Sequence, residues 1–250
     1  MIEVTYIDHC GSDLTTVNAA RVSFGKKREA LGTVTVNDKT SVVLHDTDRK
    51  LIKYLAKHRH MSPFGHAFAS FHIKAPVFVA RQLVKHKFLR WNEISRRYVS
   101  DEPYVDDEPE FYDPDNWREK ASDKKQGSGS GFVNELSCDD TDEYADDKAY
   151  LADYWEIDTS GYVEDNVYHN TLVIYEELLK NNVCPEQARM VLPQSTMTEW
   201  YWSGSLDAFS DMCNLRCKPD TQAETRVVAD AISKEMKELF QISWEALRDE

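Results

Sequence analysis

The sequence predicts an α+β fold, with a small central sheet of antiparallel or mixed strands and helices around it. Helical patterns recur along the chain, whereas strand patterns are few and not adjacent in sequence. The strands also do not alternate with helices as they do in βαβ folds. A chain of 250 residues is a common length for one domain. We therefore expect residues 1–250 to form a single domain, with an acidic, Gly/Ser-containing insertion at about 101–165.

The first quarter of the chain predicts one strand and one long helix. Residues 3–7 alternate weakly and indicate a short strand, and residues 18–24 indicate a helical turn. Residues 25–39 are polar and contain glycines, so we expect a surface loop there. Residues 46–59 begin with capping residues and place aliphatic side chains on one stripe, which predicts an amphipathic helix.

A second strand is expected at residues 67–73, where alternation places Ala67, Ala69, Phe71 and Ile73 on one face and Phe68, Ser70 and His72 on the other. Pro76 suits the first turn of a helix, and residues 77–88 continue at helical spacing. Two polar rows would flank the apolar stripe of that helix, since their members lie four residues apart. The rows are Arg81 with Lys85 and Gln82 with His86. Residues 91–98 should leave the helix as an extended or looped segment.

The C-terminal half predicts mainly helices. Helical patterns are expected at residues 165–182, 185–192, 205–215 and 221–247, and a strand at 196–203. Pro193 should stop the second of these helices.

The charge of the chain is unevenly distributed. Residues 101–165 hold 22 acidic and 5 basic residues, a net of −17 against −14 for the whole chain, so the remainder carries +3. The overall charge argues against general nucleic-acid binding. The mildly basic remainder suits small anionic ligands.

Several classes of protein do not fit the sequence. No apolar run approaches the length of a membrane span, and the N-terminus lacks the features of a signal peptide. The five scattered cysteines do not form a disulfide framework, so we expect the reducing cytoplasm. Cys213 and Cys217 lie four residues apart, but no CxxC or HxxxH partner completes a site, and we expect no metal.

The stretch 81–98, RQLVKHKFLRWNEISRRY, holds six Lys or Arg residues, one His and one carboxylate. Arginine forks and serine hydroxyls bind phosphate, but a solvated basic helix face has a similar composition. From the residues alone both interpretations stay open. Arg189 and Arg216 stand in apolar settings and are either paired structurally or directed at an anion. No GxSxG nucleophile elbow and no phosphate-binding Gly-rich loop is present.

Several segments, in order, resemble the flavin-dependent thymidylate synthases. They are AARVSF at 19–24, HMSPFGH at 60–66, FHIKAPVFVARQ at 71–82, ARMVLPQS at 188–195, YWSGSL at 201–206, and NLR followed by TQAE at 214–224. The family signature RHRxxSxNxxSxR is matched by Lys85, His86, Lys87, Arg90, Asn92, Ser95 and Arg97. The chain departs from it where lysines replace both arginines that flank His86 and Arg90 replaces the first serine.

The resemblance implies a homotetramer that converts dUMP to dTMP, with methylenetetrahydrofolate as carbon donor, NADPH as reductant and FAD as cofactor. Arg216 would contact the uracil and favour its N3-ionised form, and His60 would lie near the flavin and folate. The implied FAD contacts are Ser23, Ser62, Lys85, His86, Lys87, Asn92, Glu93, Ser205, Asp207 and Asp211. The implied dUMP contacts are Gln82, Lys85, Glu93, Ser95, Arg96, Arg97, Arg189, Leu215 and Arg216.

Three alternatives remain at this stage. The same flavin and folate chemistry can yield another 5-substituted deoxyuridylate. The basic stretch can belong to a nucleic-acid-binding regulatory module, which predicts a steep dependence of affinity on salt. It can also serve only as an interface between subunits. The enzyme hypothesis expects neither nucleic acid nor a membrane as a partner.

Overall fold

The computed structural model describes residues 1–36, 39–95, 109–114, 117–122, 128–133 and 163–248. The chain divides into two compact units. The first comprises Met1–Ala75, Val79–Glu93 and Thr198–Glu250, and the second comprises Pro76–Phe78 and Ile94–Met197. The single domain expected for residues 1–250 stays a prediction, and most of the acidic insertion lies outside the described residues.

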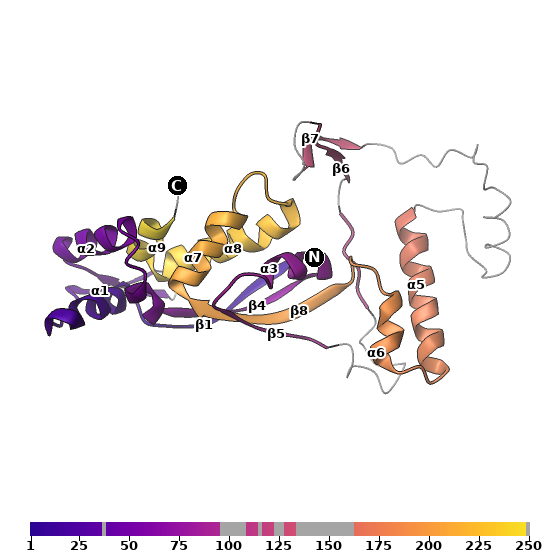
Figure 1. Cartoon of the computed structure of the whole chain (residues 1–250), viewed down its shortest axis with the longest axis horizontal. Helices are drawn as coiled ribbons and strands as arrows, with labels where there is room; N and C mark the ends of the chain where they lie inside the picture. The colour runs from indigo at the N-terminus through magenta and orange to yellow at the C-terminus, as the bar shows by residue number, and fades with distance from the viewer. Residues whose placement is uncertain (37–38, 96–108, 115–116, 123–127, 134–162, 249–250) are drawn as a thin grey trace. The chain divides into compact units, whose positions relative to one another are not determined.

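The first unit is built on a four-stranded sheet (Figure 1). Its strands are β1 (Glu3–Cys10), β4 (Phe68–Pro76), β8 (Met197–Ser205) and β5 (Leu89–Glu93), in that spatial order. β1 pairs with β4 and β5 pairs with β8, both antiparallel. β5 therefore lies at an edge of the sheet, next to the strand that leads into helix α7. This mixture of antiparallel strands and surrounding helices agrees with the predicted α+β class.

One face of the sheet forms the core of this unit. The predicted alternation along 67–73 is confirmed, because Phe71 and Ile73 are buried while Phe68 on the other face is exposed. Phe209 of α7 packs edge-on against Phe71 and Trp202, with ring centroids 5.3 and 5.5 Å away. The apolar face is thereby removed from water, which is the main driving force for docking α7 on the sheet.

The loop expected at 25–39 is instead partly a hairpin. β2 (Gly32–Val36) pairs antiparallel with β3 (Lys39–Val43) in a sheet of two strands. The segment is rich in Thr and Val, whose branched side chains favour extended backbone. Its polarity and its glycines obscured this signal in the sequence.

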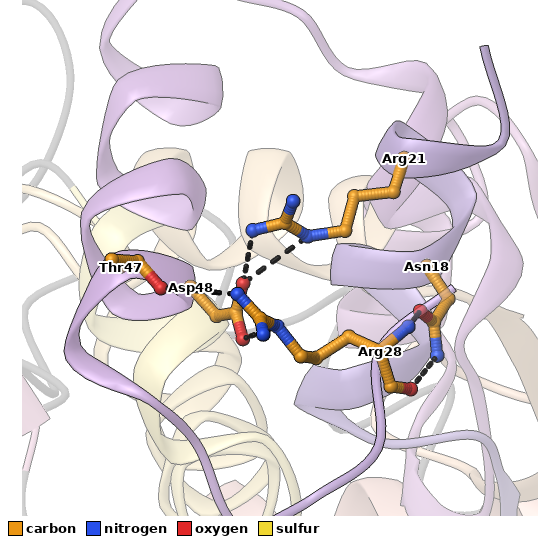
Figure 2. Close-up of polar contacts among 5 residues, drawn as sticks. All are labelled: Asn18, Arg21, Arg28, Thr47 and Asp48. Carbon is orange, nitrogen blue, oxygen red and sulfur yellow. Dashed lines mark hydrogen bonds and ion pairs between the residues drawn. The ribbon is translucent and has the colours of Figure 1, made fainter. Parts of the chain in front are cut away.

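A buried ion-pair network fixes the segment before that hairpin (Figure 2). Asp48 of α2 (Asp46–Lys57) is fully buried and pairs with Arg21, the last residue of α1 (Asp13–Arg21). Arg28 Nε lies 3.1 Å from the second Asp48 oxygen. Asn18 exchanges hydrogen bonds of 3.0 and 2.7 Å with the Arg28 backbone. Both ends of segment 21–28 are thus tied to one carboxylate.

The helix expected at 221–247 is two helices, α8 (Ala223–Leu239) and α9 (Gln241–Leu247). The break falls at Phe240, whose φ of −133° is not helical. The buried carboxylate of Asp13 accepts hydrogen bonds of 3.0 and 2.9 Å from the backbone N–H groups of Ile242 and Ser243. These N–H groups belong to the first turn of α9 and have no partner within the helix itself. Asp13 therefore stabilises the start of α9.

The helix expected at 77–88 is shorter than predicted. α3 (Val77–Leu83) ends at Leu83, and turns follow up to Phe88. Lys85, His86 and Lys87 therefore lie in a turn and not on a helix face. Arg81 and Gln82 remain helical.

Most of the remaining predicted elements agree with the structure within a few residues, but helix α1 begins at Asp13, five residues before the helical turn predicted at 18–24. α7 (Leu206–Arg216) starts after Ser205, the first residue of the helix predicted at 205–215. The 3-10 turns η1 (Val22–Phe24) and η2 (Ser62–His66) follow α1 and α2. The second unit holds the helices predicted at 165–182 and 185–192, as α5 (Val163–Lys180) and α6 (Pro185–Ala188) with the turn η3 (Arg189–Val191). It also holds the antiparallel pair β6 (Trp117–Lys120) and β7 (Ser128–Val133). None of the described helices is long and apolar enough to cross a membrane.

Candidate functional site

Arg216, at the end of α7, is held against the end of α3. Its Nε donates a hydrogen bond of 3.1 Å to His86 Nε2, and its Nη2 donates one of 3.2 Å to the backbone oxygen of Gln82. The Gln82 side chain bonds in turn to the side chain of Gln222, 2.5 Å away, just before α8. We call Gln82, His86, Arg216 and Gln222 the arginine cluster. It joins three segments that are far apart in the sequence.

The arginine cluster also explains why α3 ends early. In a continuing helix the Gln82 oxygen would accept from the His86 N–H. Arg216 bonds to that oxygen instead, and the His86 N–H donates to Leu83 at 3.1 Å. A guanidinium at the carbonyl end of a helix is favourable because it meets the negative end of the helix dipole.

The electrostatics of the arginine cluster keep the histidine neutral. Burial, followed by the positive charge of Arg216, lowers the pKa of His86 from 6.5 to about 4. Burial also lowers the pKa of Arg216, but an arginine guanidinium stays protonated in proteins. At physiological pH a neutral imidazole therefore accepts a hydrogen bond from a charged guanidinium.

A second cluster joins the turn after α2 to the start of α7. Ser205 Oγ donates a hydrogen bond of 2.5 Å to Asp207. The Leu206 N–H donates to the Ala67 oxygen at 2.9 Å, which ties α7 to the end of the 60–66 segment. One turn further along, exposed Asp211 lies 3.8 Å from Arg59. The predicted residues His60 and Ser62 are exposed on the same segment. The name histidine-loop cluster is used for the following residues: Tyr54, His58, Arg59, His60, Ser62, Ser205, Asp207 and Asp211.

Tyr54, His58 and His60 form an aromatic group within the histidine-loop cluster. The Tyr54 and His58 rings lie 4.3 Å apart, and the Tyr54 and His60 rings are stacked at 6.2 Å. All three side chains are exposed, and their rings gather near the C-terminal end of α2. Aromatic faces with hydrogen-bonding groups beside them suit planar ring ligands.

Two residues of the edge strand β5, Asn92 and Glu93, are predicted ligand contacts, and they lie on opposite faces of the strand. Glu93 shares a face with Trp91, because side chains alternate along a strand. The Glu93 carboxylate accepts from Trp91 Nε1 at 3.1 Å and from Thr198 Oγ1 at 2.8 Å. Trp91 in turn stacks on Trp200 with a centroid separation of 4.5 Å. Asn92 lies on the opposite face of β5. A small ligand on one face of the strand therefore contacts either Glu93 or Asn92, but not both.

The structure does not bring every predicted residue together. Ser95 and Arg189 belong to the second unit, and Arg96 and Arg97 lie outside the described residues. Ser23 is exposed on η1 within the segment that the Asp48 network fixes. Outside η1 and the histidine-loop cluster, the exposed predicted residues of the first unit are Lys85, Lys87, Asn92, Glu93 and Leu215.

Four further residues of this region were not predicted from the sequence. Gln222 and Thr198 hold Gln82 and Glu93 through side-chain contacts that have no signal in sequence spacing. Phe88 has a positive φ of 64° and is 85% exposed, an unusual state for a large apolar residue. Gly204 pairs with Leu89, and a Cβ there would lie 2.3 Å from Leu89 Cδ2. The same Cβ would lie 3.2 Å from the Phe88 backbone oxygen, so a larger residue at position 204 requires the Leu89 side chain to move.

Comparisons with known proteins show the family to which the chain belongs. Residues 5–240 match the family described as thymidylate synthase complementing protein, Thy1. The chain is 35% identical over 246 residues to the flavin-dependent thymidylate synthase of Thermus thermophilus, which covers 98% of this chain and 75% of the relative. It is 34% identical over 245 residues to the enzyme of the same description from Kosmotoga olearia, with 97% and 88% covered.

A solved structure shares the fold. It is a UMP/dUMP methylase, PolB, from Streptomyces cacaoi, bound with 5-Br dUMP. The TM-score is 0.69 at 26% sequence identity, with 98% of this chain and 94% of that chain covered. The sequence match, the shared fold and the match to the family profile all lead to the same assignment. The chain belongs to the Thy1 family of flavin-dependent thymidylate synthases.

Proposed function

We propose that the protein converts dUMP to dTMP, with methylenetetrahydrofolate as the carbon donor and NADPH as the reductant, through bound FAD. Tetrahydrofolate and NADP⁺ are the other products. The observation that carries the proposal is Arg216, a charged guanidinium held beside α3 by His86 and the Gln82 oxygen. Such a group can bind the polar edge of a pyrimidine.

Arg216 is suited to activate the uracil ring. A fixed positive charge beside the ring edge stabilises negative charge there, and so favours the N3-ionised form. Ionisation raises the electron density of the conjugated ring, including C5, the carbon that carries the methyl group in dTMP, and so prepares the ring for carbon transfer. Leu215, exposed beside Arg216, offers an apolar contact for the ring. Glu93, oriented by Thr198 and Trp91, is placed to accept hydrogen bonds from the nucleotide.

The residues of the first unit fit a flavin. Exposed Lys85 and Lys87 provide positive charge for its phosphates, although as point charges and not as arginine forks. Carboxylates and hydroxyls of the histidine-loop cluster suit the hydroxyl groups of the cofactor, and the Tyr54 and His60 rings suit a planar system. A bound flavin supplies the redox chemistry, which the protein side chains cannot perform.

We propose the remaining predicted contacts in the same roles. FAD binding would involve the backbone of His86 together with Ser23, Ser62, Asn92, Ser205, Asp207 and Asp211. Binding of dUMP would involve Gln82, Ser95, Arg96, Arg97 and Arg189. His60 would lie near the flavin and the folate. We further propose a homotetramer in the cytoplasm. Exposed Val22, Phe24 and Phe88 support assembly, because large apolar side chains on a surface mark interaction sites.

The first test is the visible spectrum of the purified protein, followed by an assay. Flavin absorbance, and NADPH oxidation that depends on both dUMP and methylenetetrahydrofolate, are expected. Mass spectrometry should show dTMP. A colourless protein that takes up no added FAD would refute the proposal. Light scattering tests the assembly, which should have four times the 28.9 kDa chain mass.

UMP is a second candidate substrate. The observation that favours it is the similarity to PolB, which is described as a UMP/dUMP methylase. Parallel assays with dUMP and UMP, with the products weighed by mass spectrometry, separate the two. The same measurement detects any other 5-substituent on the product.

A further inference from the structure

We propose that the His86 side chain is a positioning residue for the pyrimidine nucleotide, acting through the hydrogen bond that its Nε2 accepts from Arg216 Nε. This inference rests on the proposed function, in which Arg216 contacts the uracil. It gives the imidazole of His86 a different task from the flavin contact that its place in the signature implies. The flavin contact from this turn then belongs to Lys85 and Lys87 and to the backbone.

The partners of Arg216 are the first argument. A structural arginine in a protein interior is ordinarily paired with a carboxylate. The two recorded acceptors of Arg216 are an imidazole nitrogen and a backbone carbonyl, and both are neutral. None of the salt bridges among the described residues involves Arg216. The Arg216 guanidinium is therefore held in place by neutral groups, and its positive charge remains available to a ligand.

The geometry of the fork is the second argument. His86 Nε2 accepts the hydrogen bond from Arg216 Nε, and the Gln82 backbone oxygen accepts one from Arg216 Nη2. These two contacts fix the plane of the guanidinium, because its nitrogens are coplanar. The Nη1 edge has no hydrogen-bond partner among the described residues, which leaves it for a ligand. An arginine with only one anchor would retain rotation about its long side chain, and ligand binding would have to pay the entropy of ordering it.

The protonation state of His86 is consistent with this role. To accept from Arg216, Nε2 must be unprotonated, so the hydrogen of the neutral ring is on Nδ1. The lowering of the His86 pKa to about 4, by burial and then by Arg216, keeps the ring neutral under physiological conditions. A protonated ring would both lose the acceptor and repel the guanidinium.

Four variants of the flavin-loaded protein test the proposal. His86→Phe keeps a ring without a hydrogen-bond acceptor, and His86→Gln keeps an acceptor at a similar distance from the backbone. Arg216→Ala and the double variant His86→Phe/Arg216→Ala complete a double-mutant cycle with His86→Phe. His169→Phe, an exposed position of α5, is the matched control. Calorimetry measures dUMP affinity, and flavin fluorescence measures FAD affinity.

We expect His86→Phe to weaken dUMP binding about tenfold, since a hydrogen bond to a charged group is lost. His86→Gln should restore binding to within about threefold, and FAD affinity should change much less than dUMP affinity. In the Arg216→Ala background, His86→Phe should have no further effect on dUMP binding. If His86→Phe does not fold, His86→Asn replaces it, because the shorter amide does not reach Arg216 Nε.

Two results would overturn the inference. One is loss of FAD affinity, with dUMP affinity unchanged, in both single His86 variants. The other is an additive effect of His86→Phe in the Arg216→Ala background. Failure of the proposed function looks different. If Arg216→Ala binds dUMP like the unaltered protein, or if the unaltered protein does not bind dUMP, the assigned role of Arg216 is wrong.

Discussion

Replacing Asp48 by Asn should lower the stability of the first unit by about 2–3 kcal/mol. Removing one partner of a buried ion pair costs about 3–5 kcal/mol, because the remaining charge is left without compensation. Here the two arginines are not fully enclosed, since the side chains of Arg21 and Arg28 are 22% and 37% exposed. Both can turn toward water, and Asn keeps one acceptor, so we place the cost below the general range.

The assay is urea unfolding followed by circular dichroism, together with thermal melting. A loss of 2–3 kcal/mol corresponds to a fall of roughly 5–10 °C in melting temperature for a chain of this size. Asp46→Asn is the matched control, because it makes the same change on the same helix at an exposed position. Only a few tenths of a kcal/mol are expected there, from the helix dipole.

The network predicts how its members couple. Arg28→Gln should cost less than Asp48→Asn, because Arg21 still neutralises the carboxylate (Figure 2). In the Asp48→Asn background, Arg28→Gln should have a much smaller effect than alone. If Asp48→Asn is no less stable than Asp46→Asn, the buried carboxylate does not fix segment 21–28 and the reasoning is wrong.

Three further predictions concern the site. Thr198→Val removes the hydroxyl that donates to Glu93, and should raise the KM for dUMP several-fold in steady-state assays with flavin content unchanged. Gly204→Ala forces Leu89 away, and should cost about 1–3 kcal/mol in urea unfolding and lower the flavin content. Because folding lowers the pKa of His86 from 6.5 to about 4, the unfolded chain binds more protons in that window, and stability should fall as pH decreases through it. After allowance for partial exposure the loss is about 1–2 kcal/mol, and His86→Gln should reduce it in unfolding curves measured from pH 7 to pH 4.

The elements that form because of residues adjacent in the sequence could be predicted from local patterns. The strand at 67–73 follows from an alternation that burial of Phe71 and Ile73 imposes directly. The helix at 46–59 follows from one apolar stripe and an acidic start. In both cases the residues that decide the structure stand next to one another in the sequence, so the pattern is visible without any partner.

The errors arose where a distant group decides the structure. Residues 77–88 have helical spacing throughout, yet Arg216 bonds to the Gln82 oxygen from 134 positions away and the helix ends. The break at Phe240 depends on Asp13, which lies 229 positions from Ile242. No window of sequence contains both partners of either contact. The resemblance to a known family implied that Arg216 and His86 are site residues. Their hydrogen bond to each other could not be predicted, because it forms only when the fold brings the two residues together.

Helix α7 connects the two clusters, and this limits how the ligands can be arranged. Asp207 lies in its first turn, in the histidine-loop cluster, and Arg216 is its last residue, in the arginine cluster. A helix rises about 1.5 Å per residue, so their backbones are about 14 Å apart. That spacing cannot change without breaking a helix whose apolar side, including Phe209 and Met212, is buried. The proposed flavin contacts lie at both ends of α7, at Asp207 and at Lys85 and Lys87 on either side of His86, so the distance between them is set by one rigid element. The turn 84–88 and segment 58–66 are then the parts that can adjust to each ligand.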